Sequence, residues 1–142
     1  MKMKIDKIKQ LFETEFKPLK DKFQIIQLLE GKREFDKETI SEVTHYYKGV
    51  DIVWHPGCYV FFGNGKPYKV GRHLENSRKR VLEHIRDNTG GKISEISQFD
   101  DREILLFNVI NRDDKHWVAA VEIFLETELR KYGLAIRSKR QG

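Results

Sequence analysis

Arg80 and His84 are the first pair of residues whose types and spacing could support chemistry. They stand four positions apart in a stretch where Val81, Leu82 and Ile85 recur with helical spacing. Both side chains therefore lie on one side of a predicted helix, beside its apolar stripe. A guanidinium can hold a phosphate and an imidazole can transfer a proton near neutral pH. A solvated arginine and a satisfied surface histidine fit the same spacing.

Glu122 is the second candidate, because a carboxylate here borders an apolar stripe. Its helical neighbours are Val118, Leu125 and Leu129. Desolvating a carboxylate costs free energy unless a cation lies near it. The cation could be an arginine in an ion pair or a bound metal, and the pattern alone favours the ion pair.

The elements that must position these residues are short. Their patterns predict strands over Cys58–Phe62, Tyr68–Val70 and Glu103–Ile110, the last apolar on both faces and therefore central. Helices are predicted over Ser77–Asn88 and Lys115–Lys131. The predicted fold class is α+β, with a small three-stranded, mainly antiparallel sheet flanked by helices.

Residues 1–54 differ from the rest of the chain in the spacing of their apolar residues. Apolar residues recur with helical spacing in segments 5–12, 23–29 and 36–47, which predicts three helices. No linker separates these segments from residues 55–142, so we expect 1–54 to be a helical extension that packs on a core domain over 55–142.

The candidate residues belong to a longer series. In chain order it reads Gly57-Cys58-Tyr59, Lys69-Val70-Gly71, Arg80, His84 and Glu122. This series resembles the GIY-YIG nuclease superfamily over about residues 55–140. The resemblance implies an endonuclease that hydrolyses phosphodiester bonds in DNA with one Mg²⁺ or Mn²⁺ ion.

The resemblance also implies a role for each residue. Glu122 would hold the metal, and Arg80 would bind a nonbridging phosphate oxygen. Tyr59 would act as general base, with its pKa lowered by the Lys69 ammonium. His84 would relay the tyrosine proton or contact phosphate. If this is correct, the five side chains converge on one concave surface.

Two departures from the family pattern keep an alternative open. Lys69 stands where the family has a second tyrosine, and residues 123–142 contain no asparagine to follow the metal glutamate. The alternative is a catalytically weak or inactive nucleic-acid-binding module on the same fold. A third class is a protein-interaction domain in which residues 1–50 present a helical surface to a partner protein.

The charge distribution agrees with a polyanionic partner. The net charge is +5, yet residues 66–92 carry eight Lys/Arg against three Asp/Glu, and residues 130–142 carry five Lys/Arg and no acid. Basic stretches on an otherwise acidic chain favour nucleic acid, although solvated helix faces have similar composition. The predicted phosphate contacts are Arg72, Arg78, Lys79, Arg137, Lys139 and Arg140.

Other classes are excluded by composition. A single cysteine, Cys58, rules out a disulfide framework and zinc sites that need several cysteines. No apolar run approaches the roughly 20 residues that span a bilayer, and no signal-peptide pattern follows Met1. We therefore expect a cytoplasmic protein with no membrane partner.

Hairpin register provides a check on the site. Tyr59 and Lys69 share a face of the sheet only if the loop between their strands has an odd length, such as Gly63-Asn64-Gly65. A two-residue Asn64-Gly65 turn, which the dipeptide favours, would place Lys69 on the opposite face. The family resemblance favours the shared face.

Overall fold

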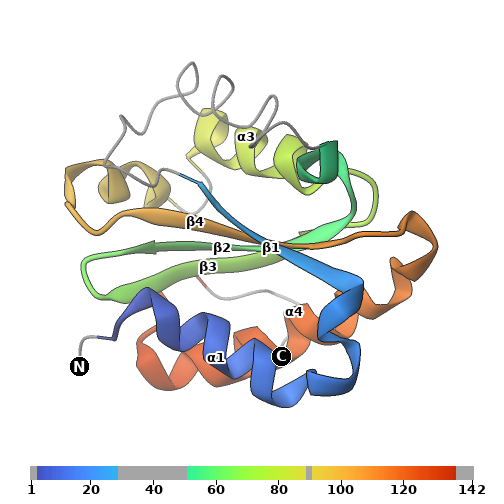
Figure 1. The fold of residues 1–142 in the computed structure, drawn as a ribbon. Coiled ribbons are helices and arrows are strands. Elements are labelled where there is room, and N and C mark those ends of the chain that lie inside the picture. Colours follow the sequence, from blue (N-terminus) through green and yellow to red (C-terminus); the bar gives the residue numbers. More distant parts are fainter. Residues whose placement is uncertain (1–2, 29–50, 89–90, 137–142) are drawn as a thin grey trace.

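The computed structural model describes residues 3–28, 51–88 and 91–136 (Figure 1). Within them, four strands form one antiparallel sheet in the order β1-β4-β2-β3. The strands are β1 (Phe23–Leu28), β2 (Gly57–Gly63), β3 (Lys66–His73) and β4 (Glu103–Val109). The predicted α+β class and the central position of β4 are confirmed, whereas the predicted count of three strands is wrong.

The additional strand is β1, in a segment that the apolar spacing predicts to be helical. Phe23 and Ile25 face one core of the protein, whereas Ile26 and Leu28 face the other. This alternation is the period of a strand. All six residues of β1 pair with β4, so tertiary pairing decides the conformation of a short apolar run that fits either period. The helix predicted over 36–47 lies outside the described residues.

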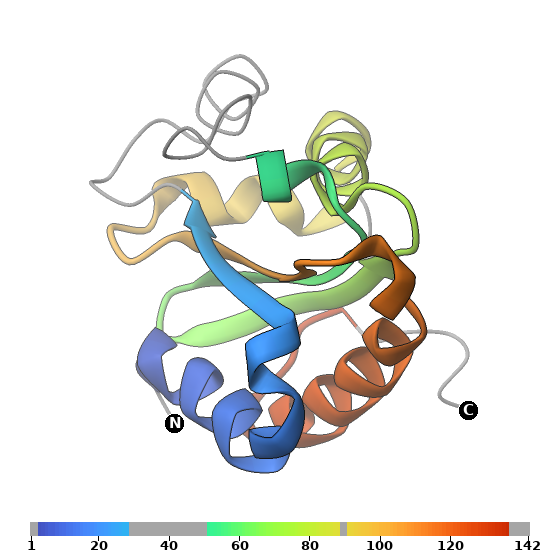
Figure 2. The same ribbon diagram turned by 45° about the vertical axis from the view of Figure 1, so that its right-hand side comes forward.

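Helices cover both faces of the sheet (Figures 1 and 2). α3 (Ser77–Asp87) and the 3₁₀ turns η3 (Asp51–Trp54) and η5 (Ile93–Gln98) lie on one face. α1 (Ile5–Glu15) and α4 (His116–Leu129) lie on the other. Each interface holds its own apolar core, so the sheet separates an α3 layer from an α1/α4 layer.

The β2–β3 hairpin closes through a two-residue turn. Asn64 and Gly65 have φ values of 53° and 67°, and positive φ at both positions is the requirement of a type I′ turn. The Asp101 carboxylate accepts hydrogen bonds from both backbone N–H groups, at 2.7 and 2.6 Å. The turn that the dipeptide favours is therefore the one that forms.

A β-bulge then restores the shared face. Phe61 pairs with Lys69, but Phe62 pairs with Pro67, which leaves Tyr68 as the extra residue of β3. Because a bulge shifts the register by one residue, Lys69 returns to the face of the sheet that Phe61 and Tyr59 occupy. The shared face is reached with a two-residue turn rather than an odd loop.

A buried polar network fixes the start of α3 on the sheet. The Ser77 hydroxyl donates to Asn108 Oδ1 at 2.7 Å, and Asn108 Nδ2 donates to the Ile52 carbonyl at 2.8 Å. The Asn108 side chain lies against Gly57, where a Cβ atom would overlap it. The Asn76 side chain caps the helix by accepting from the Lys79 N–H. These contacts set the position from which α3 presents its side chains.

Candidate functional site

The Tyr59 side chain extends from β2 across β3. Gly71 is its partner in register, and a Cβ atom at Gly71 would overlap the tyrosine ring and hydroxyl. The glycine that ends the Lys69-Val70-Gly71 triplet thus makes room for the ring. Tyr59 is 2% exposed, and its Oη lies 2.6 Å from His84 Nε2. The resemblance nominates both residues, and the fold brings them into direct contact.

His84 reaches this contact from the inner side of α3. Its ring is buried and packs edge-on against the ring of Phe61, with 6.2 Å between the two ring centroids. The residues one turn before and one position after it, Arg80 and Ile85, are only partly buried. The helical spacing therefore places His84 inside the protein and Arg80 at the rim.

The buried surroundings keep both partners neutral at neutral pH. Burial, with the nearby charges of Lys69 and Arg80, lowers the pKa of His84 from 6.5 to about 3. Burial also raises the pKa of Tyr59 well above its ordinary value, while the Arg80 guanidinium opposes that rise through charge and hydrogen bonding. The neutral Tyr59 phenol can donate to His84 Nε2 in the tautomer that carries the imidazole proton on Nδ1.

This protonation state corrects one prediction. The resemblance predicts that Lys69 lowers the pKa of Tyr59, but the net shift is upward because burial dominates. The cation that lowers the pKa of Tyr59 is Arg80, and the charge of Lys69 acts on His84. Tyr59 is therefore not a phenolate in the resting protein.

The neutral His84 has a measurable consequence for stability. Because its folded-state pKa lies below the unfolded one, the unfolded chain binds a proton that the folded protein excludes. This contribution is complete above about pH 6.5 and is lost as the pH falls toward 3. Uptake of one such proton by the unfolded chain makes the unfolding free energy fall by about 1.4 kcal/mol more for each unit by which the pH decreases.

We therefore expect His84→Gln to lose stability less steeply than the unaltered protein between about pH 6 and 5. Urea unfolding at a series of pH values measures both slopes. His116→Gln, at an exposed position, is the matched control for replacing a histidine by glutamine. Equal slopes for all three proteins would contradict a neutral, buried His84.

Arg80 lies beside Tyr59 and is open to solvent. Its side chain is 42% exposed, and Nη1 donates to the Glu83 carboxylate at 3.4 Å. An exposed ion pair of this kind is weak, so it costs little to exchange for another anion. Arg80 therefore combines contact with Tyr59 and access from outside.

Lys69 lies on the same face of the sheet as Tyr59. It is partly buried, and burial and the Arg80 charge lower its pKa, whereas Glu126 and Glu122 raise it. Its backbone forms a parallel bridge with Ile136, which extends the sheet at this edge. Lys69 adds a second cation near His84.

Glu122 comes from the opposite layer. It lies on α4, its side chain is 3% exposed, and its Oε1 accepts from Arg72 Nη1 at 2.9 Å. Arg72 faces α4 because its partner in register, Cys58, belongs to that core. The arginine ion pair that the apolar stripe favours is present.

The predicted residues are arranged around β3, the outer strand of the sheet. Tyr59, Arg80 and His84 are in direct contact on the α3 side. Glu122 lies on the α4 side and forms its ion pair with Arg72. Arg72 is the residue after Gly71, and Gly71 lies against the Tyr59 ring. The charge of Glu122 raises the pKa of Tyr59, so the two halves of the site act on each other across the outer strand.

The predicted phosphate contacts are distributed unevenly. Lys79 is exposed in the first turn of α3, next to Arg78 in the same turn. Arg72 is engaged with Glu122. The remaining three, Arg137, Lys139 and Arg140, lie outside the described residues.

The donor chemistry of Glu122 fits a magnesium ion. No cluster of three or more His, Cys, Asp or Glu side chains that could hold a metal occurs in residues 3–28, 51–88 and 91–136. Mg²⁺ does not require one, because it retains several waters and binds through one or two carboxylates together with substrate phosphates. A single buried carboxylate with an arginine beside it is compatible with that preference.

Two parts of this arrangement are not predicted from the sequence. The charge pattern assigns Arg72 to phosphate and not to Glu122, although its alternation with Gly71 along a strand indicates the α4 face. The Ser77–Asn108 pair is not singled out either, although a polar residue within the apolar run 104–109 is a signal for a buried hydrogen bond.

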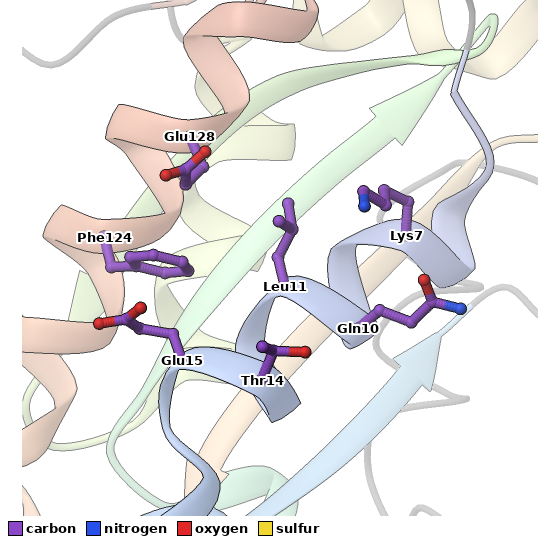
Figure 3. A pocket seen from close by; sticks show the side chains of 7 residues that line it. All are labelled: Lys7, Gln10, Leu11, Thr14, Glu15, Phe124 and Glu128. Atoms are coloured by element: carbon purple, nitrogen blue, oxygen red, sulfur yellow. The ribbon is translucent and has the colours of Figure 1, made fainter.

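A separate groove lies between α1 and α4 (Figure 3). It has a volume of about 310 Å³, and Leu11 and Phe124 point into it between polar side chains. The groove lies in the α1/α4 layer, away from Tyr59 and His84. Among the described helices, none combines the length and apolar character needed to cross a membrane.

Comparison with known proteins finds no match to this chain among protein-family models, curated proteins or solved structures.

Proposed function

We propose that the protein is a metal-dependent endonuclease that hydrolyses phosphodiester bonds in DNA. In this proposal Glu122 holds one Mg²⁺ or Mn²⁺ and Tyr59 is the general base. The observation that carries the proposal is the buried 2.6 Å contact between Tyr59 and His84, next to the Arg80 guanidinium. Residues from two separate elements, nominated by one family resemblance, meet there in an arrangement suited to proton transfer.

The contact supplies a route for the proton of the attacking water. The water proton passes to Tyr59 Oη as the tyrosine proton passes to His84 Nε2, so no free phenolate is needed. The low pKa of His84, about 3, opposes this transfer in the resting protein. The negative charge of a bound phosphate favours the charged imidazolium and reduces that opposition. The bound cation supplies charge neutralisation at the phosphate and activation of water.

Arg80 stabilises the charge that develops on the phosphate. Its guanidinium is partly exposed, contacts Tyr59 and has a weak ion-pair partner in Glu83. A preorganised cation at this position acts where charge appears in the transition state. Lys69 adds positive charge on the same face.

The alternative is a nucleic-acid-binding module that does not cleave. It is favoured by the Arg72–Glu122 ion pair, which satisfies Glu122 without a metal, and by the upward shift in the pKa of Tyr59. Such a module would bind DNA through its basic residues, with strong salt dependence.

Nicking of supercoiled plasmid by the full chain separates the two functions. We expect open-circular product with Mg²⁺ or Mn²⁺ and none with a chelator. DNA affinity that falls with salt, without any product in either metal, would support the binding module and overturn the nuclease. If the protein neither binds nor cleaves DNA, the protein-interaction class is favoured.

A further inference from the structure

The Arg72–Glu122 ion pair joins the two sides of the proposed site. Arg72 Nη1 lies 2.9 Å from Glu122 Oε1, with side-chain exposures of 33% and 3%. The carboxylate is thus enclosed, while the guanidinium reaches toward solvent. The same strand carries Gly71, beneath the Tyr59 ring, one residue earlier.

We propose that Arg72 is a displaceable internal counter-ion, which the metal must expel from Glu122 and which then turns to a DNA phosphate. The proposal rests on the proposed function, because it assumes that a metal binds at Glu122. It assigns to Arg72 a regulatory role that a simple phosphate contact would not have.

The physical basis is competition for one carboxylate. A buried carboxylate without a cation is costly, so Arg72 stabilises Glu122 until a metal arrives. A divalent cation on the same carboxylate repels the neighbouring guanidinium, and the free energy of metal binding is reduced by the lost ion pair. Arg72 therefore lowers the affinity of the resting protein for metal.

Phosphate releases that competition. A guanidinium binds phosphate with two parallel hydrogen bonds, and Arg72 is already one-third exposed. DNA that engages Arg72 removes this competitor from the Glu122 carboxylate, and a metal on Glu122 makes Arg72 available to DNA. By linkage, each ligand then raises the affinity for the other by the same factor, typically about 5- to 150-fold for coupled sites.

The test is a titration of the protein with Mn²⁺ in the absence of DNA. The concentration of free Mn²⁺ is measured by electron paramagnetic resonance. We expect Arg72→Gln to bind Mn²⁺ about tenfold more tightly than the unaltered protein, within the usual range for coupled sites. Arg72→Lys, which keeps the charge, should bind close to the unaltered protein. Glu122→Gln should lose the binding. Unchanged or weaker binding by Arg72→Gln, with loss in Glu122→Gln, would overturn the counter-ion role and leave the metal site standing.

If none of the four proteins binds Mn²⁺ and the unaltered protein does not cleave plasmid, the proposed function itself is removed and the inference with it. If Arg72→Gln does not fold, the unaltered protein provides the second measurement. The Arg72 Nε–H signal in a ¹H–¹⁵N spectrum, assigned with Arg72→Lys, should shift when Mg²⁺ is added. A signal that stays fixed while backbone amides around Glu122 move would overturn the proposal.

Discussion

Glu122→Gln is expected to reduce metal-dependent DNA cleavage by about 10²-fold or more, the scale found when a charge-stabilising element is removed. Glutamine keeps the shape of the side chain but lacks the charge that would hold a divalent cation. DNA binding should survive or improve, because the variant lacks a negative charge that would repel a DNA phosphate. Single-turnover cleavage with binding measured in parallel separates affinity from chemistry.

Glu126→Gln is the matched control for this variant. Glu126 lies one turn further along α4, is fully buried, and forms a 3.0 Å ion pair with Arg130. It shares the structural cost of losing a buried carboxylate but has no assigned part in metal binding. Parental cleavage by Glu122→Gln, or an equal loss in both variants, would contradict Glu122 as the metal ligand.

Tyr59→Phe is expected to reduce single-turnover cleavage by about 10²- to 10⁴-fold, the range for general acid–base groups. The substitution keeps the ring over Gly71 and removes only the hydroxyl that contacts His84 at 2.6 Å. DNA affinity should change little. The imidazole loses this buried hydrogen bond, so we also expect a loss of about 1–3 kcal/mol in unfolding free energy.

Tyr68→Phe shows whether the loss of cleavage is specific to the Tyr59 hydroxyl. Tyr68 is also buried, with its hydroxyl 3.5 Å from the Glu95 carboxylate on η5. Its replacement should leave cleavage unchanged once binding is taken into account. A Tyr59→Phe protein that cleaves at the parental rate would place the proton transfer elsewhere.

The parts of the fold that sequence predicts well are those set by local patterns. α3 follows from the helical spacing of its apolar residues. β4 is central because it is apolar on both faces, as its sequence shows. β1 could not be distinguished in the same way, because Phe23 and Ile26 have the i, i+3 spacing of one helix face, while a strand buried on both faces has apolar residues at any spacing. Pairing with β4, about eighty residues later in the chain, is what decides it.

The candidate site was predictable in its residues but not in its arrangement. Helical spacing places Arg80 and His84 together, yet the contact of His84 with Tyr59 requires the register of β2 on β3. Burial of Tyr59 between layers sets the direction of its pKa shift, and burial depends on packing that residue spacing does not contain. The partner of Glu122 likewise depends on which face of β3 Arg72 occupies.

The bulge at Tyr68 has a consequence for how this hairpin tolerates insertions and deletions. Losing one residue between Tyr59 and Lys69 would move Lys69 to the α4 side of the sheet, even though the hairpin could still close. Losing or gaining two residues would keep both side chains on the α3 side. Chains descended from a common ancestor with this one, if they keep the pairing of the two residues, should therefore differ in hairpin length by even numbers.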